Sequence, residues 1–511
     1  MADPGPFPEP SRRPPPPAAP RWCGPVCMLL LALVIIALTV AVALGVRFAA
    51  DEPVTYPDID RHFKYGSTGG ERESGFPFWI WQALPKVCAH HLPGEGYASL
   101  GMIYEPGRSL PVGVSMRRNL GLDRVFLNCA ACHTSTVRDT PESEPRVYTG
   151  MPAHRLDLGA FENFFFDCAM DARFSAEFIV PEIDAQAGKL GLLDRYLVYP
   201  VAIALMRERL LMLRERFKWT QMQPPWGPGR VDTFNSSKVL FNFPAERLKP
   251  HELIGTADFP SIWEQRKRKA RDDGLPMQLH WDGNNTKAEE RNKNAAFGTG
   301  TTPPTIDLKA IGRIEEWLLD VKPPKYPYPI DATLAAQGAT VYGEYCATCH
   351  GVGGDDFGGE RVGHVTPIDA IGTDRHRLDS FTPMLAQNLG SVYAGYAWRF
   401  TGFRKTFGYA NMPLDGLWLR APYLHNGSVP TVRDLLEPAS KRPAAFCRGY
   451  DVFDPVKLGF VANVCEEGPR KYFRFDTTVP GNGNAGHEGE AYGTQLPPDD
   501  KAALVEFLKT F

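Results

Sequence analysis

The sequence predicts a mainly α-helical, loop-rich chain of two domains that follow one membrane-spanning helix. At 511 residues the chain exceeds what one hydrophobic core usually holds, so two domains are expected. Glycine (48) and proline (47) are abundant, which indicates long loops, whereas 43% hydrophobic and 23% charged residues are typical of a folded protein. The net charge of −3 shows no basic excess, so nucleic acid is not an expected partner.

An uncharged segment near the N-terminus predicts the membrane helix. Residues 24–46 contain no charged side chain, and a stretch of this length can cross a bilayer. Arginines precede it and acidic residues follow it, so the positive-inside rule predicts a cytoplasmic proline-rich tail over residues 1–23. The bulk of the chain then faces the periplasm, anchored in the inner membrane. A cleaved signal peptide is the alternative, but Phe48 stands where the peptidase prefers a small residue.

Two copies of the pattern CxxCH carry the chemistry, as CAACH at 129–133 and CATCH at 346–350. This is the pattern of c-type haem attachment. Two thiols at this spacing can each form a thioether with one porphyrin vinyl group, and the adjacent histidine can reach the iron. A disulfide, zinc or thioredoxin-like site would leave both histidines unexplained. The sequence therefore predicts two covalently bound haem c groups, held by Cys129, Cys132, His133, Cys346, Cys349 and His350.

The second motif lies in a pattern typical of cytochrome c. Apolar residues at helical spacing over 335–342 lead into it, and the chain ends in an amphipathic helix with Leu504, Phe507 and Leu508 on one face. Gly338 would let these two helices cross closely, as the first and last helices of a cytochrome c do. The first motif follows a loop-like segment, which indicates a more divergent haem domain.

These observations predict two cytochrome c-like haem domains with long loops. We place the N-terminal haem domain at residues 52–320 and the C-terminal cytochrome c domain at residues 321–511. The proline-rich stretch 322–329 marks the boundary. In an oxidising compartment, Cys88 could pair with Cys168 and Cys447 with Cys465; four free buried thiols are the alternative.

Further segments are spread over about residues 75–511. Besides the two CxxCH motifs they are WGPGRVDTFN at 226–235, HWDGN at 280–284, APYLHNGSVP at 421–430 and Gly486-His487 before the last helix. Together they resemble the di-haem cytochrome c peroxidase superfamily, and more closely its rubber-oxygenase-like branch. In that superfamily one haem binds peroxide or dioxygen, the other relays electrons, and a tryptophan lies between them. Trp281 matches that tryptophan; simple packing is the alternative.

The resemblance also suggests the sixth ligand of the C-terminal haem. The peroxidases usually supply a methionine just before the final helix, but no methionine follows Met412 in this chain. His487 occupies the matching place and would make this haem bis-histidine, with a lowered potential. His425 and Met412 are the alternative ligands.

The distal side of the N-terminal haem departs from the peroxidase pattern. No histidine stands shortly before the segment that contains Trp226 and Arg230, where the peroxidases often carry one, which suggests an open iron. Trp226, Arg230 and Phe234 are the candidate pocket residues, and Arg230 could hydrogen-bond an oxygen ligand. A structural role or a haem propionate is the alternative for Arg230. His154 is the alternative sixth ligand.

The function implied is peroxide reduction at the N-terminal haem, with electrons entering through the C-terminal haem from a cytochrome or quinol-linked donor. A haem-dependent dioxygenase of an apolar substrate, with dioxygen in place of hydrogen peroxide, is the alternative that the closer branch suggests. An anchored electron-transfer cytochrome without catalysis is the non-enzymatic alternative.

Overall fold

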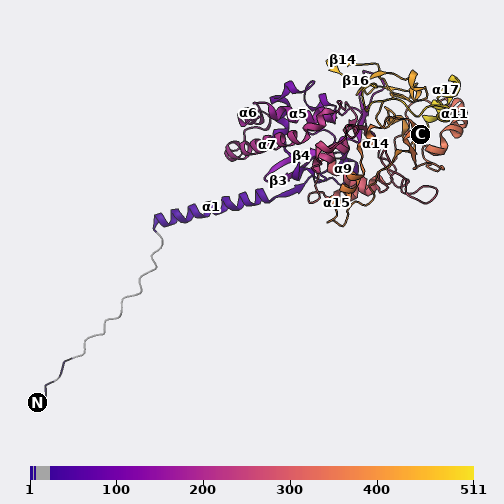
Figure 1. The fold of residues 1–511 in the computed structure, drawn as a ribbon. Helices are drawn as coiled ribbons and strands as arrows, with labels where there is room; N and C mark the ends of the chain where they lie inside the picture. Colours follow the sequence, from indigo (N-terminus) through magenta and orange to yellow (C-terminus); the bar gives the residue numbers. More distant parts are fainter. Residues whose placement is uncertain (4, 7–23) are drawn as a thin grey trace.

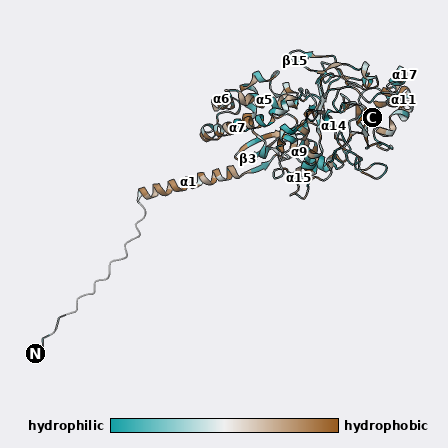
Figure 2. Ribbon diagram, viewed as in Figure 1, coloured by the Kyte–Doolittle hydropathy of each residue, from teal (hydrophilic) through white to brown (hydrophobic). Residues whose placement is uncertain are grey.

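A computed structural model describes residues 1–3, 5–6 and 24–511, so the predicted tail at residues 1–23 lies largely outside the described residues. Helix α1 (Pro25–Ala49) projects from the folded body (Figure 1) and is hydrophobic along its length (Figure 2). An 18-residue window within it has a mean hydropathy of 3.1, and none of its residues is buried. The predicted apolar helix is therefore present, and its length and composition fit a membrane anchor or a signal sequence.

The N-terminal half combines helices with one small sheet. Strands β1 (Asp51–Pro53), β3 (Val114–Asn119), β4 (Leu122–Leu127) and β2 (Phe76–Pro77) form an antiparallel sheet in that order. Its remaining strands form hairpins or short pairs: β5 (Thr134–Val137), β6 (Arg146–Thr149), β7 (Arg230–Val231) and β8 (Ala257–Asp258). Its helices after α1 are α2 (Ile59–Tyr65), α3 (Gly70–Glu73), α4 (Phe78–Val87), α5 (Leu158–Met170), α6 (Ala176–Ala187), α7 (Tyr199–Phe217), α8 (Thr233–Leu240), α9 (Ala288–Gly298) and α10 (Leu308–Leu318).

The C-terminal half is built of short elements around two longer helices. Its helices are α11 (Ala332–Tyr345), α12 (Ala347–His350), α13 (Ile368–Ile371), α14 (His376–Ser380), α15 (Pro383–Val392), α16 (Val432–Leu435) and α17 (Pro498–Leu508). Its strands are β9 (Val365–Pro367), β10 (Gly408–Ala410), β11 (Ala445–Arg448), β12 (Phe453–Asp454), β13 (Gly459–Phe460), β14 (Glu466–Glu467), β15 (Arg470–Lys471) and β16 (Phe473–Asp476). Helix outweighs strand, but these hairpins make the protein less purely helical than the sequence predicted.

Helices α11 and α17 cross closely, as the sequence predicts. A Cβ atom on Gly338 would lie 1.9 Å from the carbonyl oxygen of Ala503, so only glycine fits at the crossing. Leu504 is fully buried there, and the rings of Tyr342 and Phe507 lie 5.2 Å apart. The two helices that frame the second CxxCH motif therefore pack as in a cytochrome c.

Hydrophobic clusters cross the predicted boundary near residues 322–329. Trp263 lies in one cluster with Trp418 and Leu504, and Phe297 lies in another with Phe400. The division into two haem domains stays a prediction, since both halves of the chain contribute to the same cores.

Both predicted disulfides are present. Cys88 pairs with Cys168 and Cys447 pairs with Cys465, with Cα–Cα distances of 5.6 and 5.3 Å. The cysteines of the two CxxCH motifs are free and half-buried. The four motif thiols are therefore available to bind a cofactor, whereas the two predicted pairs of cysteines form disulfides.

Candidate functional site

The histidines of the two CxxCH motifs are held in the same way. The Nδ1 atom of His133 lies 2.9 Å from the carbonyl oxygen of Pro260, and that of His350 lies 2.7 Å from the carbonyl oxygen of Met412. A carbonyl can only accept, so Nδ1 carries the proton in both rings. Each Nε2 atom therefore keeps a lone pair that can bind a metal.

Burial keeps these side chains in the forms that suit haem attachment. It lowers the pKa of His133 to about 4 and also lowers that of His350, so both imidazoles are neutral at pH 7. It raises the pKa of Cys129 to about 11 and that of Cys132 to about 12, so the thiols are protonated. Free thiol pairs beside neutral histidines fit covalent haem.

His487 faces His350 in the C-terminal half. Their ring centroids lie 6.1 Å apart. Two metal–imidazole bonds of about 2 Å, together with the distance from each bonding nitrogen to its ring centre, sum to about 6 Å. His487 is held at a φ of 49°, an uncommon conformation for a residue other than glycine, and its amide donates to the carbonyl of Ile371. The separation suits one iron between the two rings.

The structure places the two alternative ligands elsewhere. His425 stacks on Tyr409, with ring centroids 4.2 Å apart, and its Nε2 lies 3.1 Å from the tyrosine hydroxyl. The Met412 carbonyl holds Nδ1 of His350, so the Met412 backbone lies behind that ring, opposite Nε2. Of the three candidates, the structure brings His487 to His350.

Trp281 is bonded to segments from both halves of the chain. Its indole N–H donates to the carbonyl of Asp258 at 2.8 Å, and its own carbonyl accepts from the amide of Ala410 at 2.8 Å. Two residues beyond Asp258 is Pro260, whose carbonyl holds His133, and two residues beyond Ala410 is Met412, whose carbonyl holds His350. One tryptophan thus connects, through two short backbone segments, to the histidine of each motif.

The loop around Trp281 is held firmly. Residues 279 and 285 form an isolated antiparallel bridge, and His280 and Gly283 both have a φ of 63°. Buried Asp282 accepts from the Asn284 side chain at 2.8 Å and lies 3.5 Å from the Arg377 guanidinium. This network fixes the orientation of the indole.

Arg230 is occupied by protein partners. Its guanidinium donates to the side chain of Asn482 at 2.8 Å and to the carbonyl of Trp226 at 3.1 Å, and it lies over Phe475. Burial, together with the charge of nearby Arg448, which pairs with Asp258, lowers its pKa to about 9. These contacts favour the structural alternative for Arg230.

The other candidate pocket residues lie in packed surroundings. Trp226 rests on helix α5 at Gly159, where an added Cβ would lie 3.3 Å from the indole. Phe234 is buried against Phe381, with ring centroids 4.8 Å apart, and under the guanidinium of Arg377. The structure therefore places Phe234 in a hydrophobic cluster.

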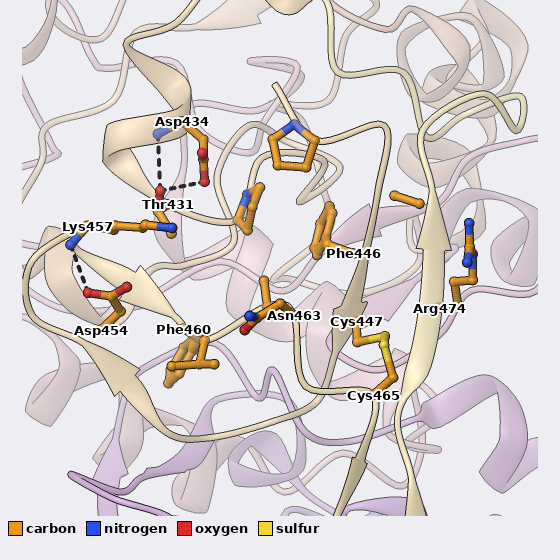
Figure 3. A pocket seen from close by; sticks show the side chains of 15 residues that line it. Thr431, Asp434, Phe446, Cys447, Asp454, Lys457, Phe460, Asn463, Cys465 and Arg474 are labelled. Carbon is orange, nitrogen blue, oxygen red and sulfur yellow. Dashed lines mark hydrogen bonds between the residues drawn. A yellow bond between two sulfur atoms is a disulfide. The ribbon is translucent and has the colours of Figure 1, made fainter. Parts of the chain in front are cut away.

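His154 is buried, and neither of its ring nitrogens has a hydrogen-bond partner among the residues that the structure describes. It stacks on Phe460 at 3.9 Å, and burial lowers its pKa to about 3. A small cavity at His154 shares Phe446 and Phe460 with a surface cavity of about 520 Å³. Figure 3 shows this larger cavity, with the Cys447–Cys465 disulfide in its wall.

Sequence reasoning missed Arg291 on α9. This half-buried guanidinium is close enough to His133 and His280 to lower the pKa of both. Its side chain makes no hydrogen bond or ion pair with the residues that the structure describes. An arginine in this position could hold a haem propionate, but a single arginine in a helix gives no signal in the sequence.

Comparisons with known proteins support the cytochrome assignment. Residues 408–447 match the profile of a family described as "RoxA-like, cytochrome c-like". That segment includes β10, Met412 and the APYLHNGSVP stretch. This match supports a relationship to the RoxA-like cytochromes. It implies covalently bound haem c and indicates a haem oxidoreductase.

Two relatives come from Sinorhizobium fredii (strain NBRC 101917 / NGR234). The uncharacterized protein y4iJ is 29% identical over 515 residues, which cover 81% of each chain. The uncharacterized protein y4iM is 29% identical over 293 residues, which cover 50% of this chain and 64% of the relative. The similarity to y4iJ extends well beyond the cytochrome segment.

Proposed function

We propose that the protein is a membrane-anchored, periplasm-facing di-haem c-type oxidoreductase that reduces hydrogen peroxide. Cys129, Cys132 and His133 would hold one haem, and Cys346, Cys349, His350 and His487 the other. When bound, the haems supply the redox chemistry. A cytochrome or a quinol-linked protein would be the electron donor.

The observation that carries the proposal is the position of Trp281. Its two hydrogen bonds reach the backbone segments that hold His133 and His350. An aromatic ring fixed between two redox centres suits electron transfer between them. The chain's contribution is to hold both histidines neutral and oriented and to keep the indole rigid.

The two iron sites would differ in access. His487 faces His350 at a distance that closes the C-terminal site, which suits a relay. The ring of His154, the alternative sixth ligand of the N-terminal haem, instead stacks on Phe460 from the C-terminal half, with ring centroids 3.9 Å apart. The N-terminal haem is therefore proposed as the site open to peroxide.

Steady-state peroxide reduction by the fully haem-loaded protein, with a reduced cytochrome as donor, tests the proposal. We expect turnover that falls in Trp281→Phe while haem content stays unchanged. Absence of turnover at full haem loading would contradict the peroxidase function.

A haem-dependent dioxygenase of an apolar substrate is the second candidate. The cavity in Figure 3 favours it, because Phe446, Phe460 and Val461 contribute apolar surface to a space of about 520 Å³. Stable dioxygen binding by the reduced protein, together with oxygen consumption that depends on an apolar substrate, would support the oxygenase over the peroxidase.

A further inference from the structure

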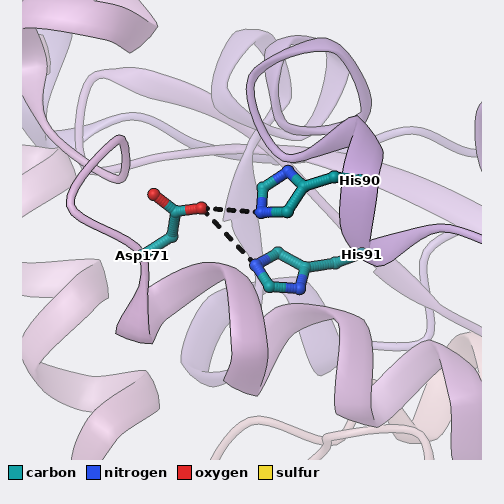
Figure 4. Close-up of side chains that lie close together, drawn as sticks. All are labelled: His90, His91 and Asp171. Atoms are coloured by element: carbon teal, nitrogen blue, oxygen red, sulfur yellow. Dashed lines mark ion pairs between the residues drawn. The ribbon is translucent and has the colours of Figure 1, made fainter.

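Two histidines and one carboxylate converge on the surface of the N-terminal half. His90 and His91 lie in the 3-10 turn η1 (Ala89–His91), and Asp171 follows the last residue of α5. The Nε2 atoms of His90 and His91 lie 2.9 and 3.5 Å from the same carboxylate oxygen, and both rings turn toward it (Figure 4). Possible ligand atoms of all three residues lie within 4.8 Å of one another.

These separations match the edges of a metal coordination sphere. Bonds of about 2.0 to 2.2 Å from zinc to imidazole nitrogen and carboxylate oxygen place neighbouring ligand atoms about 3.4 Å apart in a tetrahedron. The contact of His91 with Asp171, at 3.5 Å, lies near that value, and that of His90, at 2.9 Å, is about 0.5 Å shorter. Two imidazoles with one carboxylate form a ligand set that first-row transition ions bind with positions left for water.

The framework that carries the three residues is fixed. The disulfide joins Cys88, two residues before His90, to Cys168, three residues before Asp171. The rings of His90 and His91 are already side by side, with centroids 3.9 Å apart. Little rearrangement is therefore needed to bind an ion.

The local electrostatic field favours a cation. Helices α4 and α5 both end at this place, with Cys88 and Asp171 as their C-terminal caps. The C-terminal ends of helices carry partial negative charge. The ionised carboxylate adds to this field.

A cation from the chain already lies at this position. The Arg173 guanidinium donates to the Asp171 carboxylate at 2.8 and 3.2 Å, and the same terminal nitrogen lies 2.7 Å from both ring nitrogens of His90. One nitrogen of a neutral imidazole carries a proton, so one of these His90 contacts sets donor against donor. The Arg173 side chain is 41% exposed, and such an ion pair contributes little, so it can move aside.

We propose that His90, His91 and Asp171 form a binding site for a divalent transition-metal ion, for which Zn²⁺ is the probe. The ion clamps the turn after α4 to the end of α5 beside the disulfide. Arg173 occupies the site when the metal is absent and competes with it. This site is independent of the haems.

The test uses the full haem-loaded chain without a polyhistidine tag, freed of metal by chelator dialysis. Calorimetric titration with Zn²⁺ and elemental analysis after gel filtration give the affinity and the metal content per chain. We expect one Zn²⁺ per chain. Asp171→Asn and His91→Asn should each weaken binding by about tenfold or more, whereas Arg173→Gln should tighten it.

His251→Asn is the matched control, because His251 is an exposed histidine beside an acidic residue outside the cluster. Circular dichroism and a non-reducing gel check that each variant keeps its fold and its disulfides. Unchanged Zn²⁺ affinity in Asp171→Asn and His91→Asn would overturn the proposal. Equal weakening in His251→Asn, or no binding by the unaltered protein, would also overturn it.

Discussion

At the scale of single residues, the site is defined by where each imidazole nitrogen points. His133 and His350 donate from Nδ1 to backbone carbonyls, which leaves the lone pair of Nε2 for a metal. In His425, by contrast, Nε2 lies 3.1 Å from the Tyr409 hydroxyl. The ring of His487 faces that of His350, with ring centroids 6.1 Å apart. The ligand roles therefore follow from hydrogen bonding rather than from the number of histidines.

Replacing His487 should change the C-terminal haem. In His487→Met a thioether would replace an imidazole, and we expect the reduction potential of this haem to rise. Spectroelectrochemical titration of the purified protein measures the shift. His425→Gln is the control, since His425 pairs with Tyr409, and a potential that moves in the control but not in His487→Met would contradict the assignment.

Trp281 can be tested at the same scale. Trp281→Phe keeps an aromatic ring but removes the N–H that donates to Asp258. We expect slower electron equilibration between the haems with unchanged haem spectra, measured by flash photolysis of the partly reduced protein. Trp398→Phe is the control, since Trp398 packs on Phe297 and Tyr396 in a cluster that, among the described residues, includes neither CxxCH motif. Equal slowing in both variants would contradict a relay through Trp281.

At the scale of elements, the crossing of α11 and α17 sets the frame around the second motif. Gly338 permits backbone contact with Ala503, and Tyr342 and Phe507 pack beside it. This feature could be predicted from the sequence, because the helical spacing and the glycine are local signals. The strand pairs β11–β16 and β12–β13 could not be predicted, because all four strands are very short and because β11 and β16 are far apart in the sequence.

Substitutions of two glycines on α11, one at the crossing and one away from it, should change the free energy of unfolding in opposite directions. Gly338→Val would force the helices apart and should lower the free energy of unfolding by about 1 to 3 kcal/mol. Gly343 lies on the same helix, and an added Cβ there would meet no described atom within 4 Å other than its chain neighbours and the nearby backbone of its own helix. Gly343→Ala should therefore raise the free energy of unfolding by about 0.5 to 1 kcal/mol. Denaturant titration of the haem-loaded protein measures both, and equal effects would contradict the close crossing.

At the scale of the whole molecule, buried charges join the two halves of the sequence. Asp451, which is 2% exposed, accepts from Arg138 at 2.7 Å and from Arg155 at 3.1 Å. The hydroxyl of Thr136 donates to the same carboxylate at 2.5 Å. The segment just after the first CxxCH motif is thereby fixed to the C-terminal half.

This cluster predicts a contribution to acid stability. Burial alone would raise the pKa of Asp451, but Arg155, Thr136 and Arg138 outweigh it and lower the pKa below its usual value near 3.8. A lowered pKa in the folded state means that the stabilisation is complete above the unfolded-state pKa and is lost as the pH falls through the folded-state pKa. We therefore expect Asp451 to contribute to acid unfolding below about pH 4.

Asp451→Asn should remove that part of the pH dependence. It should also lower stability at pH 7 by about 3 to 5 kcal/mol, because Arg138 and Arg155 would lose a buried counter-charge. Thermal unfolding from pH 3 to pH 7 measures both effects. Asp139→Asn, at an exposed ion pair with Arg146, is the control. An unchanged profile in Asp451→Asn would contradict the role of the cluster.

The candidate site could be predicted only in part, for a physical reason. CxxCH, His487 and Trp281 carry side-chain chemistry that a sequence shows directly. The carbonyls of Pro260 and Met412 carry none, since any residue supplies one, and only the fold brings them to His133 and His350. The sequence leaves both an oxygen-binding and a structural role open for Arg230, because it does not reveal the partner Asn482, which lies 252 positions away.

Electron paramagnetic resonance of the oxidised, fully haem-loaded protein tests the central claim most directly. The proposal of a closed C-terminal haem between His350 and His487 and an open N-terminal haem on His133 predicts one low-spin signal and one high-spin signal. His487→Ala should convert the low-spin signal of the C-terminal haem into a high-spin signal and leave the signal of the N-terminal haem unchanged. Two low-spin signals, or a low-spin signal that survives in His487→Ala, would contradict it.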